Sequence, residues 1–85
     1  MKIEFSKKFV KLYGQMPAEI QTRARKAIAF LQDNPGHPSL EHKKMADRVD
    51  IYEIRVNINY RITYQKVGDT AILRKIGTHD LLRSP

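Results

Sequence analysis

The sequence contains no cysteine and no long run of apolar residues. Without cysteine, the chain forms neither a disulfide framework nor a cysteine-based zinc site, which fits a reducing cytoplasm. No apolar run approaches the roughly 20 residues that a membrane-spanning helix needs. The first residues, MKIEFSKKF, also lack the apolar core and the small-residue cleavage site of a signal peptide. We therefore expect a cytoplasmic protein with no membrane partner.

Acidic residues are scarce as well. The chain has 9 acidic against 16 basic side chains, which gives a formal net charge of +7 over 85 residues. Such a field attracts polyanions and speeds their encounter with the protein. Nucleic acid is therefore the first class of partner to consider and an acidic protein the second. Net charge alone does not separate the two.

Metal-ligand patterns are missing too. The three histidines, His37, His42 and His79, form no recognised ligand spacing. We therefore predict no metal site and no cofactor. Any chemistry is expected to come from the side chains themselves.

The N-terminal part has the pattern of a short strand followed by a helix. Lys2–Phe5 places Ile3 and Phe5 on one side, which favours a strand, and Ser6 is a good N-cap for the helix that follows. Gly14 is expected to end this helix in a left-handed conformation. The apolar face of the helix consists of Phe9, Leu12 and Tyr13.

A second helix is predicted to start at Pro17, because proline suits the first helical position. It ends before the sequence Asp33-Asn34-Pro35-Gly36. One face repeats at helical spacing and carries Ile20, Ala24, Ala27, Ile28 and Leu31. The two helices should therefore form an antiparallel hairpin.

The segment from His37 to Asp50 has no clear period. Leu40 and Met45 are expected to enter the core, and Lys43 and Lys44 are expected to be exposed. Two interpretations of these lysines remain open. The segment is either an ordinary solvated connection, or the lysines help to hold phosphate groups.

Alternating apolar and polar residues then predict three antiparallel strands. Pairing like with like places Val56 opposite Tyr60, with the three-residue loop Asn57-Ile58-Asn59 between them. The next turn is Gly68-Asp69, which sets Thr63 opposite Arg74 and Arg61 opposite Ile76. In this register one face carries Glu53, Arg55, Arg61, Thr63 and Arg74 together with Ile72 and Ile76. The face toward the helices carries Ile54, Ile62, Tyr64, Ala71 and Leu73.

These elements predict the fold class. We expect a single α+β domain over residues 1–85, in the order β-α-α-β-β-β. The N-terminal strand and the antiparallel helical hairpin would pack on an antiparallel sheet. A chain of this size buries roughly 60–65% of the surface that its unfolded form exposes.

The polar sheet face has two possible interpretations, a solvated surface or a phosphate-binding site. Arginine occupies its basic positions, and the planar guanidinium suits phosphate recognition. His79 follows the last strand near Arg61, and a histidine beside such arginines suits cleavage of RNA. One group would take the proton of the ribose 2′-hydroxyl and another would protonate the leaving 5′-oxygen. Glu53 could be the complementary base.

The order and spacing of four motifs resemble a known family. They are HPSL at 37–40, YEIRV at 52–56, NYRITY at 59–64 and IGTHD at 76–80. Together with the order of the elements, they are similar to the RelE/ParE superfamily of type II toxin–antitoxin toxins over nearly the whole chain. The resemblance implies a basic toxin, neutralised by a cognate acidic antitoxin and touching DNA only through the antitoxin complex.

RelE-like members cleave mRNA in the ribosomal A site without metal, so the resemblance implies ribosome and mRNA as partners. It assigns Arg61 to the strand arginine that binds phosphate, and His79 to the basic residue after the last strand. Arg55 matches one of two basic strand residues, and Glu53 stands where RelE has the other but where YoeB has a glutamate base. We predict Arg61, His79 and Glu53 as catalytic residues. The residues predicted to hold RNA are Arg55, Arg74, Lys43 and Lys44.

The chain also departs from the family pattern. The C-terminal tyrosine of RelE and YoeB is absent, since Asp80, Leu81, Leu82 and Arg83 stand there. Two alternatives to the mRNA endonuclease therefore stay open. One is a ParE-like inhibitor of DNA gyrase without nuclease activity. The other is a degenerate, non-catalytic basic RNA-binding protein.

Overall fold

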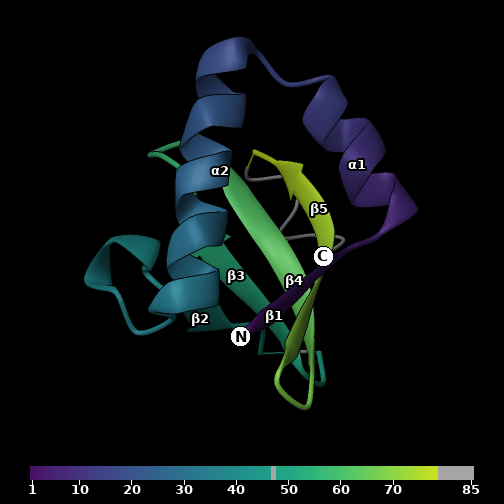
Figure 1. The fold of residues 1–85 in the computed structure, drawn as a ribbon, viewed down its shortest axis with the longest axis vertical. Helices are drawn as coiled ribbons and strands as arrows, with labels where there is room; N and C mark the ends of the chain where they lie inside the picture. The colour runs from purple at the N-terminus through teal and green to yellow at the C-terminus, as the bar shows by residue number, and fades with distance from the viewer. Residues whose placement is uncertain (47, 79–85) are drawn as a thin grey trace.

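The computed structural model describes residues 1–46 and 48–78, and Figure 1 shows the order of its elements. The helices and strands are β1 (Lys2–Phe5), α1 (Lys7–Gly14), α2 (Ala18–Asp33), the 3₁₀ helix η1 (Pro38–Leu40), β2 (Lys43–Lys44), β3 (Ile51–Arg55), β4 (Arg61–Val67) and β5 (Thr70–Gly77). This confirms the predicted α+β fold and adds the short strand β2. None of the helices in the described part is long and apolar enough to cross a membrane.

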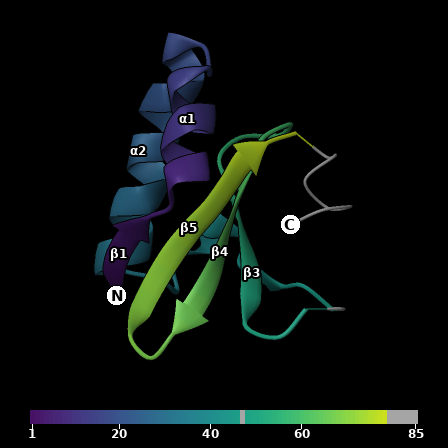
Figure 2. The same ribbon diagram turned by 90° about the vertical axis from the view of Figure 1, so that its right-hand side faces the viewer.

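The five strands form one mixed sheet in the order β1-β5-β4-β3-β2. All neighbours are antiparallel except β1, which pairs in parallel with β5 through Ile3 opposite Ala71 and Phe5 opposite Leu73. The three strands predicted to be antiparallel are so, and the parallel pairing of β1 is an addition that the sequence did not predict. Both helices lie on one side of the sheet, as Figure 2 shows in a view along its edge.

The first helix begins as predicted but ends differently. The backbone N–H of Phe9 donates to Oγ of Ser6 at 3.0 Å, which confirms Ser6 as the N-cap. Gly14 does not adopt a left-handed conformation, because the helix runs through it and is closed by Gln15 in a right-handed conformation. Pro17 lies one position before the second helix, at its N-cap.

The core lies between α2 and the sheet. The predicted apolar face of α2 is confirmed, with Ala24 and Leu31 fully buried and Ile28 partly buried against the core. Leu40 also enters the core, at 1% exposure. Met45 does not enter it and is only half-buried, with its backbone N–H donating to the carbonyl of Ile51.

The register of the β3–β4 hairpin is as predicted. Ile54 lies opposite Ile62 and Arg55 opposite Arg61. The backbone N–H of Val56 donates to the carbonyl of Tyr60 at 3.0 Å, which closes the predicted three-residue loop. This hairpin therefore keeps its apolar residues on the helix side.

The register of the β4–β5 hairpin agrees with the prediction only near its turn. A β-bulge follows the pair Tyr64–Leu73, and beyond it Thr63 lies opposite Lys75, not Arg74. Arg61 lies opposite Gly77, not Ile76. The extra residue turns Ile76 to the helix side, where it lies opposite Ile62 with 1% exposure. The predictions that placed Ile76 and Arg74 by a regular register were therefore wrong.

Candidate active site

The sheet face opposite the helices carries charged side chains on three adjacent strands. The pairings Glu53–Thr63 and Thr63–Lys75 place one residue of each strand on this face. Arg61 lies on the same face, because it precedes Thr63 by two positions in β4. We call these four residues the charged face. Two of its members, Glu53 and Arg61, were predicted as site residues.

Glu53 and Arg61 form an ion pair that is mostly buried. Oε1 of Glu53 lies 3.3 Å from Nε of Arg61, and the two side chains expose 9% and 19% of their surface. Nη1 of Arg61 also donates to the carbonyls of Asn57 at 2.5 Å and Tyr60 at 3.0 Å. These contacts fix the guanidinium beside the carboxylate.

The second oxygen of Glu53 is the least satisfied polar atom of this pair. Oε2 is buried and has no hydrogen-bond partner among the described residues. An unpaired buried acceptor is costly, and a carboxylate oxygen more so. The arrangement suits a ligand that brings its own donor, such as a hydroxyl group.

Arg55 reaches away from this pair, toward the open edge of β3. It forms an ion pair with Glu41, and both side chains are partly exposed. The hydrogen bond from Arg55 is the main cause that holds the pKa of Glu41 below its usual value, and the charges of Arg55 and Arg61 lower it further. Nothing in the sequence pattern indicated Glu41.

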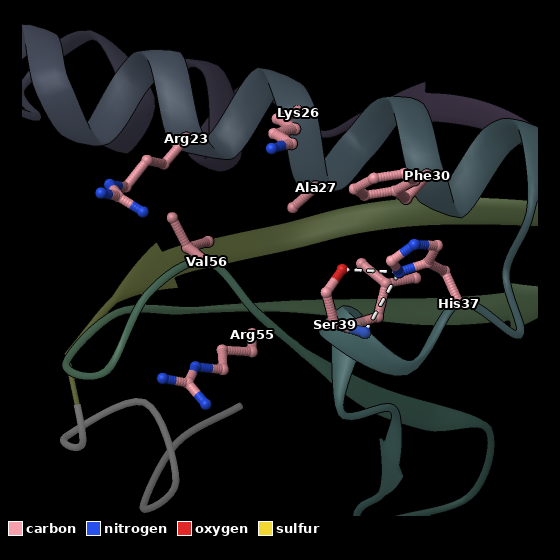
Figure 3. Close-up of a pocket in the computed structure, with 9 residues that line it drawn as sticks. Arg23, Lys26, Ala27, Phe30, His37, Ser39, Arg55 and Val56 are labelled. Atoms are coloured by element: carbon pink, nitrogen blue, oxygen red, sulfur yellow. Dashed lines mark hydrogen bonds between the residues drawn. The ribbon is translucent and has the colours of Figure 1, made fainter.

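Arg55 also lines a pocket of about 380 Å³ between α2, η1 and the end of β3. Arg23 and Lys26 of α2 face the same pocket, as does His37, which is bonded to Ser39 (Figure 3). The structure therefore places Arg55 at the rim of the charged face and not at its centre.

The two predicted lysines of β2 are separated by the pleat of the sheet. Lys43 lies opposite Glu53 and therefore joins the side of the charged face. Lys44 lies opposite Tyr52, on the other side. There it lines a different cavity, of about 420 Å³, with His42, Tyr64 and Lys66.

Basic residues gather around Lys75 at the β5 side of the charged face. Burial is the main cause that lowers the pKa of Lys75, and the nearby charges of Lys8, Arg74 and Arg48 lower it further. Lys8 belongs to α1. The start of α1 is held against β5 by two hydrogen bonds, from the backbone N–H of Ser6 to the carbonyl of Leu73 and from the Ser6 hydroxyl to the carbonyl of Arg74. The predicted residue Arg74 is thus close to the site, as part of the bulge.

The remaining predicted catalytic residue, His79, lies outside the described residues. The two described histidines take part in other contacts: His37 with Ser39, and His42 with Pro35 and Tyr64. Within residues 1–46 and 48–78, no group of three or more histidine, aspartate or glutamate side chains could hold a metal ion.

Comparison with known proteins shows which family the sequence and the fold resemble. A family model described as a ParE-like toxin domain matches residues 18–80. Toxin RelE3 from Methanocaldococcus jannaschii is 36% identical over 78 residues, which cover 89% of this chain and 88% of that protein. A chain of the RelB–RelE antitoxin–toxin complex from Methanococcus jannaschii is 30% identical and has a TM-score of 0.78, with 94% of each chain covered.

A likeness in fold alone extends further. A chain of the intact Escherichia coli RelBE toxin–antitoxin complex has a TM-score of 0.73 at 16% identity, with 91% of this chain and 94% of that chain covered. At this identity the match shows a shared arrangement of helices and strands.

Proposed function

The chain belongs to the RelE/ParE superfamily of toxin–antitoxin toxins, and we propose that it cleaves mRNA on the ribosome. Its partner in the cell would be a cognate antitoxin, as in the RelB–RelE complex to which it is similar. The net charge of +7 favours an acidic antitoxin, and the same charge favours the RNA of the ribosome.

One observation carries the proposal: the buried carboxylate of Glu53 is held beside Arg61 and keeps one oxygen without a partner. Oε2 would take the proton of the ribose 2′-hydroxyl as that oxygen attacks the phosphorus. Arg61 would stabilise the charge that develops on the phosphate oxygens. His79 remains a predicted acid or base. The remaining predicted RNA contacts are Arg55, Arg74, Lys43 and Lys44.

The test is Glu53→Gln, which keeps the size of the side chain and removes its basicity. Loss of a general base typically costs about 10²–10⁴-fold in rate, so growth arrest and A-site cleavage should both disappear. Cleavage is measured by mapping mRNA 5′ ends after expression of the toxin. Arg61→Ala should have the same effect on cleavage.

Two controls make this test decisive. Lys66→Gln changes an exposed residue of β4 on the opposite sheet face and should leave cleavage unchanged. The unfolding midpoint of Glu53→Gln shows whether the variant is folded. A folded Glu53→Gln variant that cleaves as fast as the wild type would disprove the assignment of the base.

The match to a ParE-like family model favours a second candidate, inhibition of DNA gyrase without nuclease activity. Expression would then cause DNA damage and trapped gyrase cleavage complexes, with mRNA left intact. A third outcome is RNA binding with a steep dependence on salt and no cleavage, as expected of a degenerate RNA-binding protein. The same expression experiment separates the three.

A further inference from the structure

A row of three side chains crosses the charged face from β3 to β5. Thr63 lies directly opposite Glu53 on one side and directly opposite Lys75 on the other. Adjacent strands are about 4.8 Å apart, so the backbones of Glu53 and Lys75 are separated by roughly 10 Å. Thr63 is fully buried and uncharged, so no charged side chain of β4 stands between them in the row.

The bulge at Arg74 creates this row. In a regular register Arg74 would lie opposite Thr63, and Lys75 would turn to the helix side with Ile62. The extra residue brings Lys75 to the charged face instead. The site therefore depends on an irregularity of β5.

The surroundings of Lys75 favour loss of its proton. It is half-buried, and among the described residues the charged groups that lower its pKa include Lys8 from α1, Arg48 from the segment before β3, and Arg74 from its own strand. Burial and like charges both disfavour the ammonium form. A lysine in such a place is a better proton donor than one in open solvent.

We propose that Lys75 is the general acid of the cleavage reaction and protonates the 5′-oxygen as it leaves. This inference rests on the proposed nuclease function. The bond between O2′ and phosphorus forms while the bond between phosphorus and O5′ breaks. The proton of the 2′-hydroxyl passes to Glu53 and a proton of Nζ of Lys75 passes to O5′. The products are a 2′,3′-cyclic phosphate and a 5′-hydroxyl.

The positions of Glu53 and Lys75 in the row suit their roles as base and acid. In an in-line displacement the attacking and leaving oxygens lie on opposite sides of the phosphorus, so the base and the acid must stand on opposite sides too. With each group about 3 Å from its oxygen, the two catalytic atoms are roughly 9–10 Å apart. The backbone separation of roughly 10 Å between Glu53 and Lys75 matches this requirement, and Arg61 lies beside Glu53 for the developing charge.

The pH dependence of the rate tests the role of Lys75 apart from binding. Cleavage should fall at high pH as Lys75 loses its proton. Removing a neighbouring positive charge raises the pKa of Lys75, so Lys8→Ala and Arg48→Ala should each move this fall to higher pH. Lys66→Gln should not move it. An unchanged profile in both variants would contradict the inference.

The decisive experiment compares two substrates on programmed ribosomes. One mRNA has an ordinary A-site codon, and the other has sulfur in place of the 5′-bridging oxygen at the scissile bond. Sulfur leaves without protonation, so loss of the acid no longer matters. Lys75→Gln should cleave the ordinary mRNA about 10²-fold more slowly or worse and should cleave the sulfur substrate at nearly the wild-type rate. Glu53→Gln should remain slow on both.

Each other outcome has a definite meaning. If Lys75→Gln slows both substrates equally, Lys75 only binds RNA and the inference is wrong. If His79→Gln is restored by sulfur and Lys75→Gln is not, the acid is His79, and the proposed function stands without Lys75. If the wild-type chain leaves both substrates intact, the proposed function fails and the inference fails with it.

Discussion

The two faces of the central strands are both buried but differ in what they bury. On the helix side, Ile54, Ile62 and Leu73 are fully buried and Ile76 exposes 1%. On the opposite side, the same strands bury a carboxylate and a hydroxyl group and hold a partly exposed guanidinium beside them. One face removes apolar surface from water, and the other removes charge.

Burial on these two faces makes different contributions to the free energy of folding. Apolar burial stabilises the fold by about 25 cal/mol for each Å² removed from water. Burial of an ion pair often gives no net stabilisation relative to apolar residues of similar size. A stable fold therefore does not require the Glu53–Arg61 pair. A local feature that costs stability is expected at a functional site, which fits the place of this pair in the proposed reaction.

The largest loss of stability is expected from a substitution on the apolar face. Leu73→Ala removes a fully buried side chain from the middle of β5 and should lower the free energy of unfolding by about 3–5 kcal/mol. Because a small domain has only about 5–15 kcal/mol in total, toxicity should fall with stability. Urea unfolding of the purified variant measures the change. Val67→Ala, at an exposed position, is the control and should change stability by less than about 1 kcal/mol.

On the charged face, we expect loss of one partner of the Glu53–Arg61 pair to lower stability more than loss of both. Arg61→Met leaves the carboxylate of Glu53 buried without its cation and should cost about 2–3 kcal/mol, less than for a fully buried pair because Arg61 is partly exposed. The double variant Glu53→Met, Arg61→Met should recover most of this loss and stay inactive. The measurement is a double-mutant cycle of unfolding free energies beside an mRNA cleavage assay.

The cycle has a clear contrary result. If the double variant is less stable than Arg61→Met alone, the ion pair stabilises the fold and the charged face is not a cost carried for function. If the double variant cleaves mRNA, the pair has no part in the chemistry.

Local patterns in the sequence were sufficient to predict the helices, the β3–β4 register and the placement of Glu53 and Arg61 on one sheet face. The reason is that alternation fixes the register wherever one face is apolar, as with Val56 and Tyr60. The parallel pairing of β1 with β5 joins segments almost 70 residues apart, and no local pattern encodes it. The ending of α1 was missed because Gly14 is compatible with a helix as well as with a cap.

The bulge in β5 was the main failure, although the sequence contains a signal for it. Leu73 and Ile76 are three positions apart, so strict alternation would place them on opposite faces. Burying both on the helix side requires one extra residue between them, and the bulge at Arg74 supplies it. The neighbours Lys8, Arg48 and Glu41 come from three other segments, and only the folded chain brings them to the site.

The smallest predicted effect concerns the hydroxyl of Tyr64, which lies on the helix side of the sheet opposite Tyr52. The carbonyl of Pro35 only accepts, so Nδ1 of His42 carries its hydrogen, and Nε2 accepts from the Tyr64 hydroxyl when the ring is neutral. Burial raises the pKa of Tyr64, so this hydroxyl stays protonated at physiological pH. Tyr64→Phe should lower stability by about 1 kcal/mol, or roughly 4–8 °C in Tm. Tyr52→Phe, which keeps the ring that stacks on Tyr64, is the matched control for thermal unfolding.

Cleavage by Tyr64→Phe should match the wild type, because this hydroxyl lies away from the charged face. A loss of cleavage at unchanged Tm would place the site nearer the cavity that His42 lines.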